Sequence, residues 1–199
     1  MSQPEDRMFM SSQSESGVEA ALFRDVVRHL ASGVTIITSS LHGEPVGLTA
    51  TAVCSVSATP PLLLVSLTQT SRTAQGVAET GAFAVHLLAY NSRRYAEQFA
   101  SLSDHFQHTE YSTTSEQHIP LLADAFAWLV CRVEQSMSAA DHTVFIGRVL
   151  QCELRNKSPE PLLYFDRNYR KLAAGIGSGA ENLEPWGSSQ DAGLPGFGW

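Results

Sequence analysis

This sequence of 199 residues has few features of a membrane, secreted or nucleic-acid-binding protein. No apolar run approaches the roughly 20 residues that a transmembrane helix needs. Its 13 Lys and Arg residues are outnumbered by 20 Asp and Glu residues, which gives a formal net charge of −7 at pH 7. Because a phosphate backbone binds clustered cations, we expect no nucleic-acid partner and no anionic membrane partner.

Cysteine is also scarce. Only Cys54, Cys131 and Cys152 occur, and no two of them form a CxxC pair. Each lies in an apolar, strand-like stretch, which predicts three buried and reduced thiols. The first residues, MSQPEDRMFMSSQSESG, show neither the apolar core of a signal peptide nor the Arg-rich pattern of a transit peptide. We therefore expect a cytoplasmic protein.

The common catalytic motifs are missing as well. The chain contains no GxSxG, HExxH, Walker loop or GxGxxG, which argues against hydrolase and kinase chemistry. The residues Asp104, His105, His108 and His118 match no common spacing of metal ligands, so no metal is expected. The missing GxGxxG does not exclude a nicotinamide substrate, because a reductase that binds NADH transiently needs no Rossmann fold.

The chain reads as one folded body with two weakly ordered ends. Residues 1–17 are rich in Ser, Gln and Glu, and residues 175–199 are rich in Gly and Pro. The body between them, 18–174, is long enough to bury a sizeable core.

Extended segments dominate this body. The apolar stripe of Leu22, Val26 and Leu30 predicts an opening helix that ends at Gly33. Further helices are predicted over 71–80 and from Ser92, and strands over 34–40, 46–57, 61–67, 83–88, 126–137, 141–154 and 161–169. Because helices and strands do not alternate regularly, an antiparallel barrel is expected rather than a doubly wound parallel sheet.

The stretch GLTATAVCSVS, residues 47–57, is predicted to be extended with one small, hydroxylic face. That face carries Thr49, Thr51, Ser55 and Ser57, and the opposite face carries Ala50, Ala52, Cys54 and Val56. Short side chains and hydroxyls suit the wall of a site for a flat isoalloxazine ring. An amphipathic edge strand with its polar face in water gives the same pattern, so the alternation alone leaves both open.

Two further segments carry candidate chemistry. Ser71 is predicted to cap a helix whose first turn holds Arg72 and Thr73, which is either a site for a terminal phosphate or an ordinary cap with a solvated Arg. Asp141 and His142 begin a strand, where the imidazole either faces a cleft or belongs to a structural turn.

Taken in chain order, the segments resemble the flavin reductase-like family of split-barrel FMN-binding proteins, the small reductase components of two-component flavin monooxygenases. The resemblance spans about 22–172. It rests on the segments FRDVVRHLASGVTIIT, GLTATAVCSVSATPPLLLVSL, SRT, GAFAVHLLAYNSRRYAEQFA, PLLADAFAWLVCRVEQ, DHTVFIGRV and PLLYFDRNYRKL.

The resemblance implies a homodimer of antiparallel split barrels in which NADH or NADPH passes a hydride to FMN or FAD. The reduced flavin would then diffuse to a partner monooxygenase. Two other functions stay open: an enzyme that retains its flavin and acts directly on an organic, biosynthetic substrate, and a non-catalytic flavin-binding protein.

The same resemblance assigns roles to individual residues. It places His142 near the nicotinamide, with Asp141 beside it. The flavin-binding positions that it implies are Thr49, Ala50, Thr51, Ala52, Ser55, Val56, Ser57, Ser71, Arg72, Thr73, Tyr169 and Arg170. This sequence departs from the family pattern at Thr51, Ala52, His86 and Ala140. Of these, Ala140 replaces a Gly before Asp-His, where the turn is expected to require a positive φ.

Overall fold

The computed structural model describes residues 17–101, 105–157 and 159–172. The two ends predicted to be weakly ordered, residues 1–17 and 175–199, lie outside this range except for Gly17. The helices are α1 (Ala20–Val27), α2 (Arg72–Thr80), α3 (Arg93–Phe99) and the 3-10 helix η1 (Tyr90–Ser92). The strands are β1 (Ser32–Gly33), β2 (Thr35–Leu41), β3 (Glu44–Ala50), β4 (Val53–Ala58), β5 (Pro61–Thr68), β6 (Ala82–Leu87), β7 (Tyr111–Thr113), β8 (Pro120–Leu122), β9 (Ala127–Ala139), β10 (His142–Leu154), β11 (Leu163–Phe165) and β12 (Asn168–Arg170).

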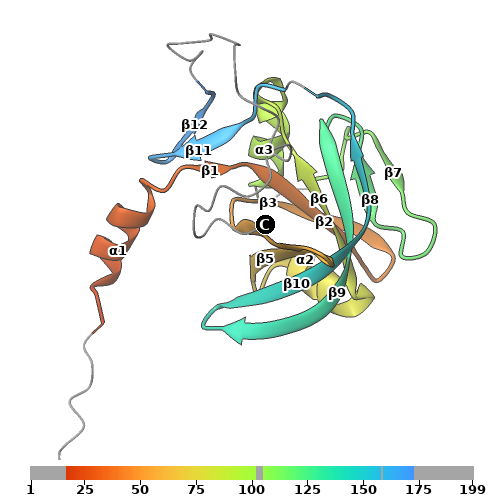
Figure 1. Ribbon diagram of the computed structural model, residues 1–199, viewed down its shortest axis with the longest axis horizontal. Coiled ribbons are helices and arrows are strands. Elements are labelled where there is room, and N and C mark those ends of the chain that lie inside the picture. Colours follow the sequence, from red (N-terminus) through yellow and green to blue (C-terminus); the bar gives the residue numbers. More distant parts are fainter. Residues whose placement is uncertain (1–16, 102–104, 158, 173–199) are drawn as a thin grey trace, which may run out of the picture.

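About half of the described chain lies in strands, which pair in antiparallel fashion (Figure 1). The main sheet has seven strands in the order β3-β2-β6-β9-β10-β5-β4. A small sheet, β1-β11-β12, and the pair β7-β8 lie beside it. The predicted fold class, mainly β with a few helices and antiparallel sheets, is confirmed.

The hairpin β2-β3 is formed by the first two extended segments that the sequence predicts. Its two-residue loop consists of His42 and Gly43, with φ angles of 54° and 81°. Two successive positive φ angles define the type I′ turn, whose twist matches that of the flanking strands, and glycine adopts such an angle without steric cost.

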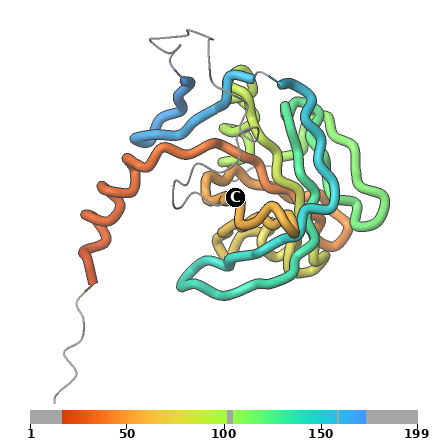
Figure 2. The backbone as a smooth tube through the Cα atoms, viewed as in Figure 1, coloured from red at the N-terminus to blue at the C-terminus, as the bar shows by residue number. Residues whose placement is uncertain are grey.

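The single long strand predicted over 46–57 is wrong. The chain is broken at Thr51 and Ala52, and β3 pairs with β2 whereas β4 pairs with β5. These two residues therefore connect the two edge strands of the seven-stranded sheet. Edges that are joined by so short a link must lie close together, so the sheet curls into a barrel that is split between β3 and β4, a path that Figure 2 traces.

The barrel interior and α2 share one core. Phe83, Val65 and Ile37 are fully buried inside it, and Val77 of α2 joins the same cluster. The apolar positions of α2 therefore fix the helix against the barrel, mainly against β2, and this contact sets where the beginning of α2 points.

The opening helix is shorter than predicted and lies apart from the core. α1 ends at Val27, and Gly33 belongs to β1 rather than to the end of the helix. Leu22 and Val26 of the predicted apolar stripe lie in α1, whereas Leu30 lies beyond its end. The helix projects from the barrel and buries none of its residues (Figure 1). The helical spacing of apolar residues thus predicted the helix correctly. Among the described residues, however, none covers the apolar face of α1.

The prediction of three buried thiols holds only for Cys131. Cys54 and Cys152 are exposed, because they lie on the edge strand β4 and in the last part of β10, where residues on both faces of the strand are exposed. Burial raises the pKa of the Cys131 thiol to about 12. In the part of the chain that the structure describes, no helix is long and apolar enough to cross a membrane.

Candidate functional site

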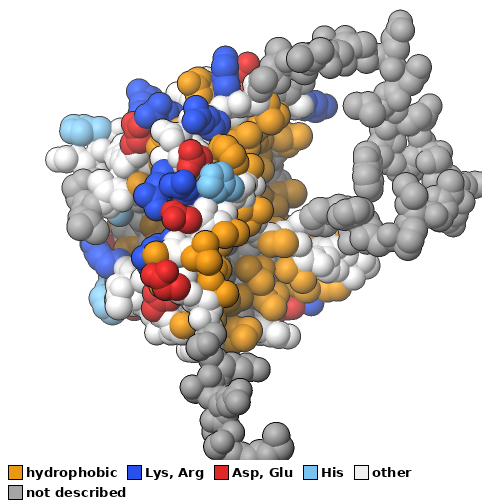
Figure 3. Space-filling model, turned by 90° about the vertical axis from the view of Figure 1, so that its left-hand side faces the viewer, with side chains coloured by type: hydrophobic (Ala, Val, Ile, Leu, Met, Phe, Trp, Pro, Cys, Tyr) orange, Lys and Arg blue, Asp and Glu red, His pale blue; other side chains and the backbone are white. Residues whose placement is uncertain are grey.

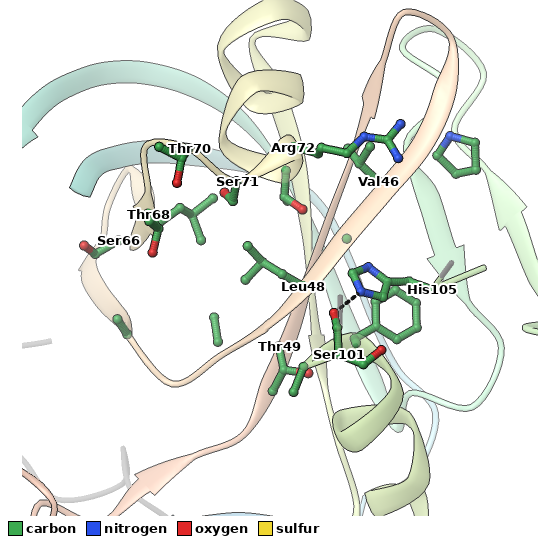
Figure 4. A pocket seen from close by; sticks show the side chains of 18 of the residues that line it. Val46, Leu48, Thr49, Ser66, Thr68, Thr70, Ser71, Arg72, Ser101 and His105 are labelled. Carbon is green, nitrogen blue, oxygen red and sulfur yellow. Dashed lines mark hydrogen bonds between the residues drawn. The ribbon is translucent and has the colours of Figure 1, made fainter. Parts of the chain in front are cut away.

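A cavity of about 1030 Å³ opens at the split of the barrel (Figure 4). It is bounded by β3, the end of β5, the beginning of α2 and the segment that follows α3. Its lining includes the predicted residues Thr49, Ala50, Thr51, Ala52, Ser71, Arg72, Thr73 and His142. The fold therefore brings together three segments that the sequence analysis had treated separately.

One end of the cavity is built from small and hydroxylic residues. The Thr49 hydroxyl donates a 2.7 Å hydrogen bond to the Ala96 carbonyl, which ties β3 to α3. The backbone N–H of Ser66 donates to the Ala52 carbonyl at 3.0 Å, which ties the link between β3 and β4 to β5. These bonds hold short side chains and peptide groups at the surface of the cavity, so a flat ring can approach the backbone closely.

The beginning of α2 forms the anion-binding part. The Ser71 hydroxyl accepts a 3.1 Å bond from the backbone N–H of Ala74, as predicted for an N-cap. The N–H groups of Arg72 and Thr73 have no acceptor within the helix, because they belong to its first turn. Together with the positive end of the helix dipole and the Arg72 guanidinium, they suit a phosphate group.

His142 lies at the rim of the cavity, directly after a tight turn. Ala140 has a φ of 52°, as expected for the position where the family pattern has glycine. The His142 Nδ1 atom lies 2.8 Å from a carboxylate oxygen of Asp141, and Nε2 lies 3.4 Å from the Thr68 hydroxyl. Because Nδ1 must donate to the carboxylate, Nε2 of the neutral imidazole is an acceptor at the cavity.

The Asp141 carboxylate is the electrostatic partner of this imidazole. The hydrogen bond from His142 lowers the pKa of Asp141 below its ordinary value. The acid therefore stays ionised and keeps the ring orientation fixed, although both side chains are partly open to solvent.

Other predicted residues lie outside the main cavity. Ser55, Val56 and Ser57 are on the edge strand β4, beyond the break in the chain. Tyr169 lines a second cavity of about 210 Å³, which shares Thr49 and Thr51 with the first. Arg170 is exposed on β12 and lines neither of these two cavities. The roles implied for these five residues stay predictions, as do those of the residues that line the main cavity.

Several lining residues were missed by the sequence analysis. Ser66 and Thr68 alternate with the buried Val65 and Leu67 on β5, so the period of two could have indicated a polar face there. No such signal marks His105, which lines the cavity together with residues of β3 although the two are far apart in the sequence.

The residues present fit a flavin. A neutral heteroaromatic ring needs a flat wall with donors and acceptors, and the small residues around Thr49 and Thr68 supply one. A ribityl phosphate needs fixed donors and positive charge, and the first turn of α2 supplies both. The two parts belong to one continuous cavity.

Comparisons with known proteins agree with this geometry. Residues 27–173 match the model of the flavin reductase like domain. The chain is 37% identical to a flavin reductase (NADH) of Kitasatospora aureofaciens over 157 residues, which are 77% of this chain and 82% of that protein. It is 35% identical to the reductase component of a 4-nitrophenol 4-monooxygenase/4-nitrocatechol 2-monooxygenase of Rhodococcus opacus, over 71% of this chain and 76% of that protein. The solved structure of the NADH:FAD oxidoreductase SgcE6 of Streptomyces globisporus superposes with a TM-score of 0.72 at 30% identity, covering 78% of this chain and 94% of that one.

Proposed function

The chain belongs to the flavin reductase like family, and we propose that it is an NAD(P)H-dependent flavin reductase that supplies reduced FMN or FAD to a partner monooxygenase. One observation carries the proposal: a single cavity joins the anion-binding first turn of α2 to the rim where His142 presents Nε2. A flavin phosphate and a nicotinamide thus find their partners in the same site.

The residues of this chain bind and orient rather than react. The flavin supplies the redox chemistry, because its ring accepts a hydride from NAD(P)H. Ser71, Arg72 and Thr73 hold the phosphate, and the wall around Thr49 holds the ring. His142 orients the nicotinamide at the rim and needs no base function, since the transfer of a hydride removes no proton from NAD(P)H.

Anaerobic mixing with NADH and an excess of free FMN or FAD tests this function. A reductase bleaches the whole excess of flavin, because reduced flavin leaves and oxidised flavin replaces it. Bleaching of a single bound equivalent would instead indicate a retained flavin and an organic substrate. If no flavin is bleached with NADH or NADPH, the protein is a non-catalytic flavin binder and the proposal is wrong.

The active protein is proposed to be a homodimer. The apolar residues Leu22, Phe23 and Val26 of α1 are exposed, and Figure 3 shows apolar side chains in a band on this side of the molecule. Contiguous exposed apolar surface of this kind is typical of subunit interfaces. A second copy of the chain would bury it.

Light scattering after size-exclusion chromatography tests the dimer. Replacing Leu22 and Val26 together by Gln is expected to give monomers, because it removes apolar area from the helix face. Arg24→Gln on the same helix serves as the control and leaves the dimer intact. A monomeric unmodified protein would contradict the proposal.

Location in the cytoplasm stays a prediction, which fractionation of producing cells would check.

A further inference from the structure

The cavity extends well beyond the anion-binding turn of α2. It follows β3 from Ala50 back to Glu44, six residue steps or about 20 Å of extended chain. Its volume of about 1030 Å³ lies at the upper limit of the range, about 300–1000 Å³, that is typical of small-molecule sites. We call the part beyond Ser71 the outer lobe. Its lining comprises Glu44, Pro45, Val46, Gly47, Arg72, Phe99, Ser101, His105 and Phe106.

One wall of the outer lobe is a supported aromatic surface. The His105 imidazole packs on the Phe99 ring, with 5.3 Å between centroids and a tilt of 31°. Phe106 meets the same Phe99 ring edge to face at 5.2 Å. The His105 Nε2 atom donates a 2.6 Å bond to the Ser101 carbonyl (Figure 4). The imidazole is therefore held in place, with Phe99 covering one of its faces.

The opposite wall carries an available positive charge. Arg72 is exposed, and its guanidinium forms no ion pair or hydrogen bond with any residue in 17–101, 105–157 or 159–172. In Figure 4 it points over Val46 toward the side of the cavity where His105 lies. Arg72 directly follows the cap residue Ser71, so it lies between the phosphate-binding turn and the outer lobe.

We propose that the outer lobe binds the adenosine diphosphate half of FAD, so that this enzyme prefers FAD to FMN. The inference rests on the proposed function and names the flavin that the site takes. Adenine stacks on His105, because nucleobases stack on flat side chains without needing a specific sequence of donors. Arg72, which lies beside the first phosphate at the beginning of α2, also binds the second phosphate, which FMN lacks. The Glu44 carboxylate at the far end accepts hydrogen bonds from ribose hydroxyls.

Equilibrium dialysis of the full chain with oxidised FAD or FMN tests the proposal without any hydride transfer. The unmodified protein is expected to bind FAD about tenfold more tightly than FMN, the size of one stacking contact. His105→Ala should abolish most of this preference. His108→Ala replaces a histidine of the same segment that lines neither cavity, and the preference should persist.

A second variant is needed because His105→Ala removes the stacking surface and could also loosen the segment around residue 105. Arg72→Gln removes a guanidinium that lies near one phosphate of FMN and near both phosphates of FAD. It should weaken the binding of both flavins, and that of FAD several-fold more than that of FMN. Equal affinities for FAD and FMN in the unmodified protein would overturn the proposal. So would equal losses for both flavins in the two variants.

NADH also contains an adenosine diphosphate half and could occupy the outer lobe in place of FAD. Steady-state kinetics distinguish these two ligands. If His105→Ala raises the KM for NADH by the same factor with FMN and with FAD, the outer lobe belongs to the nicotinamide substrate and the proposal is wrong. If neither flavin binds in dialysis, the flavin site itself is wrong, and this inference fails with it. Binding of FAD without reduction would contradict only the proposed function.

Discussion

The Nδ1 atom of His142 lies 2.8 Å from the carboxylate of Asp141, its neighbour in the chain. This contact turns Nε2 toward Thr68 and the cavity. The imidazole is therefore oriented by the residue before it, and that residue is itself placed by the turn at Ala140.

Replacing His142 by Ala is expected to lower NAD(P)H turnover while flavin affinity stays nearly intact. Losing one polar contact at the nicotinamide corresponds to about tenfold in kcat/KM. Stopped-flow reduction and flavin binding measured on the same sample would check this. The pKa of Asp141 should also rise toward its ordinary value, because its hydrogen-bond donor is gone. His42→Ala, which changes an exposed histidine that does not line the cavity, is the control. Loss of the flavin site in His142→Ala would contradict the assignment.

Ala140→Gly should stabilise the protein. Ala140 has a φ of 52°, where a Cβ atom is strained by about 1 kcal/mol and glycine is not. The midpoint of thermal unfolding is expected to rise by about 2–4 °C for a chain of this size. Ala139→Gly, at the neighbouring position in β9, should lower it. A lower midpoint for Ala140→Gly would show that the turn carries no strain.

Gly47→Ala should disturb the site through α3. A Cβ at this position would lie 2.8 Å from Cε1 of Phe99 and 3.2 Å from the Ile37 carbonyl oxygen. Overpacking of this kind costs about 1–3 kcal/mol, and the displaced Phe99 would also weaken flavin binding. Urea unfolding and flavin titration measure the two effects. Gly33→Ala, where a Cβ meets nothing within 4 Å, should change neither.

His86 should make the fold sensitive to acid. Its side chain is fully buried, and Nδ1 lies 3.0 Å from the Ile36 carbonyl. Burial, and secondarily the charge of Arg155, lower its pKa from the ordinary 6.5 to about 4. The unfolded chain therefore binds more protons between these two pKa values, so stability falls as pH drops through this window. The full loss is about 3 kcal/mol at pH 4 relative to neutral pH.

Urea unfolding at several pH values would test this with His86→Asn, whose amide does not titrate. The variant should lose less stability than the unmodified protein between pH 6.5 and 4. His118→Asn at an exposed position should follow the unmodified protein. Parallel curves for His86→Asn and the unmodified protein would contradict the assignment.

Local sequence signals predicted the helices and strands well where the spacing of apolar residues was regular. The strands β9 and β10 and the helix α2 form close to their expected bounds, because alternation and capping are properties of neighbouring residues. The Ser71 cap was also predictable for this reason. The positive φ of Ala140 was instead expected from the resemblance to a family that has glycine at this position. The break at Thr51 and Ala52 was not predictable from neighbouring residues. It exists because β3 pairs with β2 whereas β4 pairs with β5, so one strand ends and another begins at these two residues.

By itself, the sequence determined the chemistry that was available: a hydroxylic segment around Thr49, a capped helix at Ser71 and an Asp-His pair after a turn. Only the tertiary structure decided that these segments share one cavity, because they meet through the curling of a sheet whose pairings span distant parts of the chain. The place of His105 beside β3 was decided in the same way, by packing on Phe99. The tertiary structure likewise decides that the apolar face of α1 is exposed, because no other part of the described chain packs against it.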